Sequence, residues 1–132
     1  MRTSEQIRAE NALARVNDLN TEPDELRGLY RSYVDRLGPA IMMNGLGQAL
    51  ATELAAGSGS GARERAHRRL YENIQGWLCR SDGNIYPDAA DLLQAIMAND
   101  QSKYLLAQAE ALAWLDWHKK FCRAELPETG GE

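Results

Sequence analysis

Apolar side chains recur at three- and four-residue intervals along almost the whole chain, and this helical spacing limits the folds that the sequence can adopt. In one stretch Leu26, Leu29, Tyr33 and Leu37 fall on a single helical face. β-Branched residues are sparse, whereas Ala, Leu, Arg and Glu are abundant, so strands have little support. With 132 residues the chain can bury one core without disulfides. We therefore predict an all-α, compact single-domain bundle of about six helices.

Caps and turn signals divide the chain into these helices. The pattern Thr3-Ser4-Glu5-Gln6 predicts a capping box at the start of the first helix. The pair Gly38-Pro39 is expected to end the second helix, and Pro39 to open the third. Glycine and serine between Gly57 and Gly61 are typical of a linker that carries no chemistry. We expect helices over residues 3–18, 24–37, 39–55, 62–79, 88–97 and 100–124, a domain over 1–126, and a flexible tail over 127–132.

Two glycines, Gly45 and Gly47, lie inside the apolar stretch MNGLGQAL of the third expected helix. A dinucleotide fingerprint needs a third glycine where Leu50 stands and a strand before the motif, and a phosphate loop needs a Gly-Lys-Ser/Thr sequence. On a helix, Gly45 and Ala49 share one ridge, and Gly47 and Ala51 share another. These small-residue ridges favour close packing against another helix, of this chain or of a partner, over ligand binding.

The same stretch predicts a core stripe and a polar pair. Asn44 and Gln48 are four residues apart, so their amides would supply directional hydrogen bonds at a contact between subunits. We assign Asn44, Gly45, Gly47 and Gln48 to a subunit interface. The residues expected to face the core at helical spacing are Met43, Leu46, Leu50 and Leu54.

Metal-ligating and catalytic residue types do not gather in recognisable motifs. His118 and Cys122 are one turn apart on the last expected helix, but two ligands do not make a metal site. His67 and Cys79 are three turns apart and do not converge. No serine, cysteine or lysine lies in a nucleophile motif. We predict no catalytic residue, no metal and no cofactor.

The two cysteines and the N-terminus indicate the compartment. Cys79 and Cys122 each lie in an apolar helical pattern, which is typical of buried thiols in a reducing environment. The N-terminal stretch MRTSEQIRAEN lacks the apolar segment of a signal peptide, and the longest apolar runs are too short to span a bilayer. We expect a cytoplasmic protein with no membrane anchor.

Arginines crowd the start of the fourth expected helix. The net charge of −4 gives no attraction for nucleic acid by bulk charge, so an anionic partner needs a local basic patch. The stretch ARERAHRRL supplies one, with Glu64 and Glu72 each four residues from Arg68. Arg63, Arg65 and Arg69 have no such neighbour, and their charge at a helix start is unfavourable with the helix dipole. A solvated face and an RNA-phosphate contact both fit Arg63, Arg65, Arg68 and Arg69.

A second basic group lies on the last expected helix, in EALAWLDWHKKFCRAEL. Its apolar residues cover more than one core stripe, which is typical of a central helix or of a contact surface. Lys119, Lys120 and Arg123 near its end favour the helix dipole and need no ligand for that reason alone. They are also candidates for a basic rim that contacts RNA.

Three segments together resemble a known family. They are Met1-Arg2-Thr3 followed by Gln6 and Arg8-Ala9, then Asn44-Gly45-Leu46-Gly47-Gln48, then Glu110-Ala111-Leu112 followed by Trp117, Lys119, Lys120 and Phe121. In this order they resemble the small helical subunit of the type III-B CRISPR Cmr effector complex. Where that family's pattern has an apolar residue after the tryptophan, this chain has His118.

The resemblance implies a non-catalytic subunit of an RNA-guided, RNA-targeting defence complex. Copies of it would form an inner filament beside the backbone subunits that carry the guide RNA, with target RNA in the groove between. The implied partners are other subunits of the complex, especially the backbone subunit, copies of the chain itself, and guide and target RNA. The alternative is a small helical DNA-binding regulator, since compact helical domains with an arginine-rich helix often bind DNA.

Overall fold

Helices form most of the computed structural model, which describes residues 1–129. Within that range there are six helices and no strand, so the all-α prediction is confirmed. None of these helices is both long and apolar enough to cross a bilayer. Their bounds are α1 Ser4–Asn17, α2 Asp24–Asn44, α3 Leu46–Ala56, α4 Ala62–Leu78, α5 Leu92–Ala98 and α6 Gln101–Glu125.

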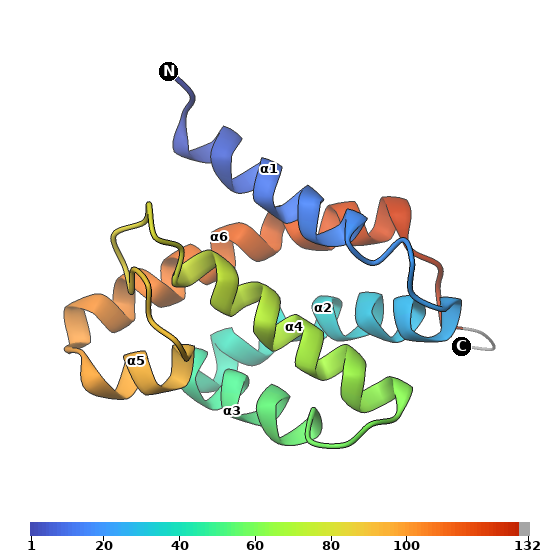
Figure 1. The fold of residues 1–132 in the computed structure, drawn as a ribbon. Helices are drawn as coiled ribbons and strands as arrows, with labels where there is room; N and C mark the ends of the chain where they lie inside the picture. The colour runs from blue at the N-terminus through green and yellow to red at the C-terminus, as the bar shows by residue number, and fades with distance from the viewer. Residues whose placement is uncertain (130–132) are drawn as a thin grey trace.

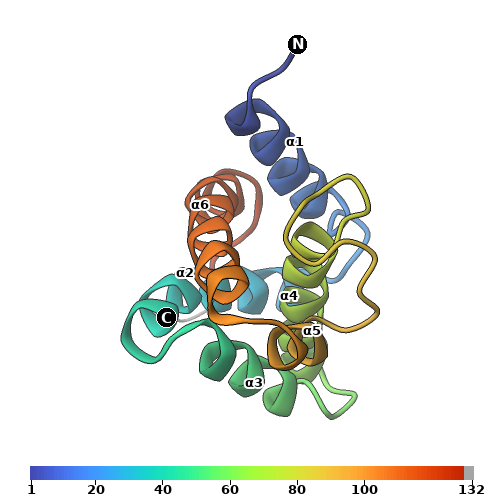
Figure 2. The same ribbon diagram turned by 90° about the vertical axis from the view of Figure 1, so that its left-hand side faces the viewer.

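Helices α2 and α6 form the centre of the bundle and run antiparallel (Figure 1). Helix α1 packs along α6, and α4 packs across α2 and α3. The short α5 lies beside α3, at the end of the molecule where α6 begins (Figure 2). Side chains from all six helices therefore meet in one core, and the largest fully buried one is Trp114 of α6.

Local caps explain where several helices begin. The predicted capping box is present: the Gln6 backbone N–H donates to the Thr3 hydroxyl at 3.2 Å, and the Thr3 N–H donates to the Gln6 side chain at 2.8 Å. Asp100 caps α6 by accepting from the Lys103 N–H at 3.1 Å. In the same way Asp91 caps α5, which begins at Leu92 and not at Asp88 as predicted.

The expected break at Gly38-Pro39 is wrong, because α2 continues through both residues to Asn44. Proline costs the helix a hydrogen bond, and Gly38, with no Cβ, lessens the clash with the proline ring that follows it. Leu37 and Ile41, on either side of the pair, are both buried. Burial of this continuous apolar stripe holds the helix together across the proline.

The last predicted segment lies partly outside the described residues. Residues 130–132 of the expected tail are not described. Residues 127–129 run beside α2, and the Glu128 carbonyl oxygen lies 3.2 Å from the position a Cβ would take on Gly28.

Both cysteines are buried free thiols, and burial raises the pKa of Cys122 to about 12.

A chain of buried hydrogen bonds joins four helices. His118 Nδ1 donates to the Ala12 carbonyl at 2.9 Å, and its Nε2 accepts from the Tyr30 hydroxyl at 2.6 Å. The Tyr30 oxygen in turn accepts from the Asn73 amide at 2.9 Å. Burial lowers the pKa of His118 to about 4, against the effect of the Ala12 carbonyl, so the imidazole is neutral at pH 7.

We expect the neutral His118 to make folding pH-dependent. In the unfolded chain this histidine takes up a proton near pH 6.5, whereas in the folded protein it does so only near pH 4. The free energy of unfolding therefore falls as pH drops from 6.5 to 4, by about 3 kcal/mol in total. Urea unfolding at several pH values measures this loss. In His118→Gln the free energy of unfolding should change less between pH 6.5 and 5, and an unchanged pH dependence would contradict the assignment.

Candidate functional site

The glycine stretch forms a corner between two helices and not the interior of one. Gly45 has φ +88° and ψ 159°, a backbone conformation that is open essentially to glycine alone. Helix α2 ends here and α3 begins at Leu46. The predicted helix through Gly45 is therefore wrong, because a residue with this conformation cannot continue an α-helix.

The corner is held by α6. The Leu46 backbone N–H donates to the Gln108 side-chain oxygen at 2.9 Å, and the Gly47 N–H donates to the Tyr104 hydroxyl at 3.0 Å. These side chains satisfy two N–H groups that have no partner at a helix start. The sequence predicted that these glycines pack closely against a helix of this chain or of a partner. The neighbour is α6 of the same chain.

Asn44 and Gln48 lie on the outside of this corner. Asn44 and Gln48 are both exposed, and within residues 1–129 neither side chain makes a hydrogen bond. The break at Gly45 also divides the predicted core stripe. Leu46 and Leu50 are fully buried, but Met43 is 86% exposed and Leu54 is 44% exposed, which corrects the prediction for these two.

The arginines at the start of α4 are less free than the sequence indicates. Arg65 contacts Glu22 at 2.8 Å, and Arg69 contacts the same carboxylate at 2.7 Å. Glu22 lies in the loop between α1 and α2, more than forty positions away in the sequence for each arginine. Arg65 and Arg69 have no partner on their own helix, and the packing of this loop on α4 supplies the carboxylate that the local sequence lacks.

Within residues 1–129, neither Arg68 nor Arg63 pairs with a carboxylate. Arg68 donates to the carbonyls of Gly57 and Gly59 in the loop before α4, and not to Glu64 or Glu72, which lie four residues from it. These bonds fix the glycine-rich loop against the helix. Arg63 makes no hydrogen bond or ion pair within the described residues.

The basic residues of α6 face carboxylates of their own fold. Arg123 pairs with Asp35 of α2 at 3.1 Å, and Lys119 lies 3.7 Å from Asp116. Lys120 makes no ion pair within residues 1–129. Because α4 begins at the end of the bundle where α6 finishes, both predicted basic groups lie toward the same end of the molecule (Figure 1).

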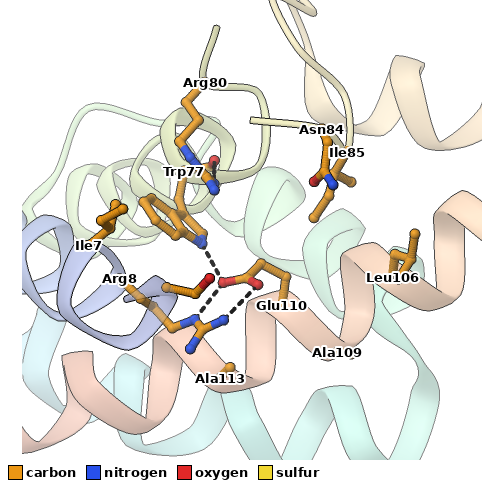
Figure 3. A pocket seen from close by; sticks show the side chains of 11 residues that line it. Ile7, Arg8, Trp77, Arg80, Asn84, Ile85, Leu106, Ala109, Glu110 and Ala113 are labelled. Carbon is orange, nitrogen blue, oxygen red and sulfur yellow. Dashed lines mark hydrogen bonds and ion pairs between the residues drawn. The ribbon is translucent and has the colours of Figure 1, made fainter. Parts of the chain in front are cut away.

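A pocket of about 520 Å³ between α1, α4 and α6 contains a cluster that sequence reasoning missed (Figure 3). Arg8 donates two hydrogen bonds to Glu110, at 2.6 and 2.9 Å. The Trp77 indole N–H donates to the same carboxylate at 2.9 Å, and the Arg80 guanidinium lies 3.6 Å from the Trp77 ring centroid. The resemblance included both Arg8 and Glu110, but they are 102 positions apart and nothing local pairs them.

This pocket has the character of a structural junction. Burial opposes ionisation of Glu110, yet the hydrogen bonds from Arg8 and Trp77 lower its pKa below the ordinary value. Its carboxylate is thus ionised and fully engaged, which does not suit a general base. Elsewhere His118 is enclosed in the core, and among residues 1–129 no three His, Cys, Asp or Glu side chains are placed to hold a metal ion.

Comparison of the sequence with known proteins shows the family to which the chain belongs. The family model described as "CRISPR-associated protein (Cas_Cmr5)" matches residues 4–125, the span from the first residue of α1 to the last of α6. The chain belongs to this family. The curated protein "CRISPR system Cmr subunit Cmr5" from Thermus thermophilus is 30% identical over 128 residues, which cover 97% of this chain and 100% of that protein.

The Cas_Cmr5 match confirms the resemblance drawn from the three sequence segments. It includes the glycine corner and the residues that hold it. It also includes the Arg8–Glu110 pair and both basic groups. All the candidate surfaces of this chain therefore lie within the residues that the family model matches.

We expect the two glycines of the corner to respond differently to alanine. Gly45→Ala places a Cβ 3.0 Å from the Tyr104 hydroxyl in a conformation that alanine rarely adopts, which should cost roughly 1–3 kcal/mol of unfolding free energy. Gly47→Ala is the matched control, because its Cβ meets Tyr104 only at 3.6 Å and alanine favours a helix. Urea unfolding followed by circular dichroism compares the two. Equal stability of both variants would contradict the role of the corner.

Proposed function

We propose that the chain is a non-catalytic small subunit of a type III-B CRISPR Cmr complex, an RNA-guided effector that acts in the cytoplasm in antiviral defence. The family match over the whole helical bundle carries this proposal. A relative named as a Cmr subunit matches over its full length and supports the same assignment. The partners are the other subunits of the complex, above all the backbone subunit.

The state of the reactive side chains supports a role without catalysis. Burial raises the pKa of both cysteine thiols, so their nucleophilic thiolates are scarce at pH 7. Glu110 is held by Arg8 and Trp77, and His118 is neutral in the core. The subunit then acts through its shape and surface.

Within the complex we place copies of the chain in an inner filament beside the backbone subunits, with guide and target RNA nearby. The amides of Asn44 and Gln48, at the corner made by Gly45 and Gly47, are proposed contacts to a neighbouring subunit. The proposed RNA-facing residues are Arg63, Arg65, Arg68, Arg69, Lys119, Lys120 and Arg123.

The proposed RNA-facing residues differ in how far carboxylates of the fold already neutralise their charge. Arg63 and Lys120 have no carboxylate partner among the described residues, so a phosphate would meet an unshared positive charge. Arg65 and Arg69 share the one carboxylate of Glu22, which leaves a net positive charge at this point. Arg123 is paired with Asp35, so we expect it to contribute less to RNA binding.

Purification with a tagged backbone subunit tests the assignment. We expect the wild-type chain to co-purify with the other Cmr subunits and with CRISPR RNA. If the isolated chain instead bound duplex DNA with sequence preference and did not assemble, the alternative of a DNA-binding regulator would replace the proposal.

Removal of the free cations tests the RNA surface. In the assembled complex we expect Arg63→Gln with Lys120→Gln to weaken target-RNA binding and to flatten its salt dependence by about 0.7 per lost phosphate contact. Arg2→Gln is the matched control, since Arg2 is an exposed arginine paired with Glu10 near the N-terminus. Filter binding at several salt concentrations measures both. An unchanged salt slope in the double variant would remove Arg63 and Lys120 from the surface.

A further inference from the structure

A groove of about 220 Å³ separates the two central helices, α2 and α6. At the position of Gly38 its floor is open, because no neighbouring atom lies within 4 Å of the place a Cβ would take. Leu112 of α6 lines this groove together with Gly38 and Pro39 of α2. The remaining lining residues are Val34, Asp35, Leu115, Asp116, Lys119 and Arg123.

Two exposed apolar residues continue the groove toward the end where α6 begins. Met42 follows Gly38 by one turn of α2, and Leu105 precedes Leu112 by two turns of α6, so each falls on the face that lines the groove. Met42 is 73% exposed and Leu105 is 57% exposed. The groove therefore has an apolar end that no part of residues 1–129 covers.

The surroundings of this end carry almost no charge. From residue 37 to residue 62 the one charged side chain is Glu53, which is buried and contacts His67 at 2.8 Å. From residue 104 to residue 109 there is none. A chain in which 26% of the residues are charged thus has no charged residue three or four positions from Met42 or Leu105 along either helix.

The opposite end of the groove is charged but balanced. Arg123 pairs with Asp35, and Lys119 lies near Asp116, so two cations meet two anions. The two cations without a carboxylate partner, Arg63 and Lys120, do not line this groove, so the groove offers a phosphate backbone less net positive charge than the surface that carries them. Any charged side chain brought to the apolar end would lose water without gaining an ion pair. The only complementary occupant of that end is an uncharged, apolar surface.

We propose that the apolar end of the α2–α6 groove, formed by Met42, Leu105 and Leu112 with Gly38 at its floor, docks a helix of another protein subunit that presents uncharged apolar side chains. A groove between two helices suits the apolar ridge of a third helix, and the absence of a Cβ at Gly38 allows close approach. Met42 is adaptable in shape and suits such a contact. The identification of the partner as a Cmr subunit rests on the proposed function.

The end of another copy that carries the α4 arginines and the carboxylates of Glu22 and Asp24 does not complement this surface. A second copy that presented its own apolar end would form a closed, two-fold pair and not an extended filament. We therefore assign the groove to a different subunit, and self-association becomes an outcome that the experiment must detect.

Leu105→Lys and Met42→Lys test the docking surface in the full-length chain with the assembled complex. Both side chains are mostly exposed, so each variant should keep the wild-type circular dichroism spectrum and melting temperature. We expect each to lower capture by the tagged complex at least tenfold, because the lysine would be desolvated against an apolar helix. Leu106→Lys is the matched control: Leu106 is 56% exposed and adjacent in sequence, but it lines the Arg8–Glu110 pocket on another face of α6. Its capture should remain within twofold of wild type.

The outcomes separate this inference from the proposed function. If the wild-type chain is not captured at all, the proposed function fails and the docking partner is not a Cmr subunit. If wild type is captured and the two groove variants are captured equally well, the docking surface is wrong. Weaker capture by Leu106→Lys alone would assign docking to the pocket, and loss of RNA binding with normal assembly would assign the groove to RNA. Sedimentation of the isolated wild-type chain as a dimer that Leu105→Lys dissociates would assign it to a second copy.

Discussion

The buried hydrogen-bond chain through His118 is the interaction on which the packing of the bundle depends. It joins the Ala12 carbonyl of α1, the imidazole of α6, the hydroxyl of Tyr30 in α2 and the Asn73 amide of α4. Each polar group in this chain would be costly to bury alone, so the four helices must meet in one arrangement for all of them to be satisfied. The Trp114 ring stacks on the imidazole at 4.1 Å and seals the network from water.

This fixed core gives the molecule two unlike ends. Where α4 begins and α6 finishes, arginines, lysines and carboxylates gather, and most of the cations already have acceptors within the fold. Where α2 ends and α6 begins, Met42, Met43 and Leu105 are exposed with few charges nearby. Salt-screened ionic contacts and apolar burial suit different partners, so the proposed RNA surface and the proposed protein-docking surface lie at separate ends.

Local patterns predicted much of this fold. The helical class, the capping box at Thr3 and the limits of the fourth and last helices follow from interactions within four residues, and a single sequence contains all of these. The family could also be recognised, because its segments are read in order along the chain. The passage of α2 through Pro39 could not be predicted, since burial of Leu37 and Ile41 by other helices outweighs the local signal for a break.

By itself, the sequence determined that the chain is helical, where several of its helices begin, and which residues carry charge. Only the tertiary structure decided which charges are already neutralised and which apolar residues remain uncovered. Glu22 reaches Arg65 from 43 positions away, and Arg8 reaches Glu110 from 102. Gly45 turns the chain, so that Met43 faces solvent while Leu46 enters the core. Such pairings depend on how helices cross in space, and helical periodicity records only that a face is apolar and not what will cover it.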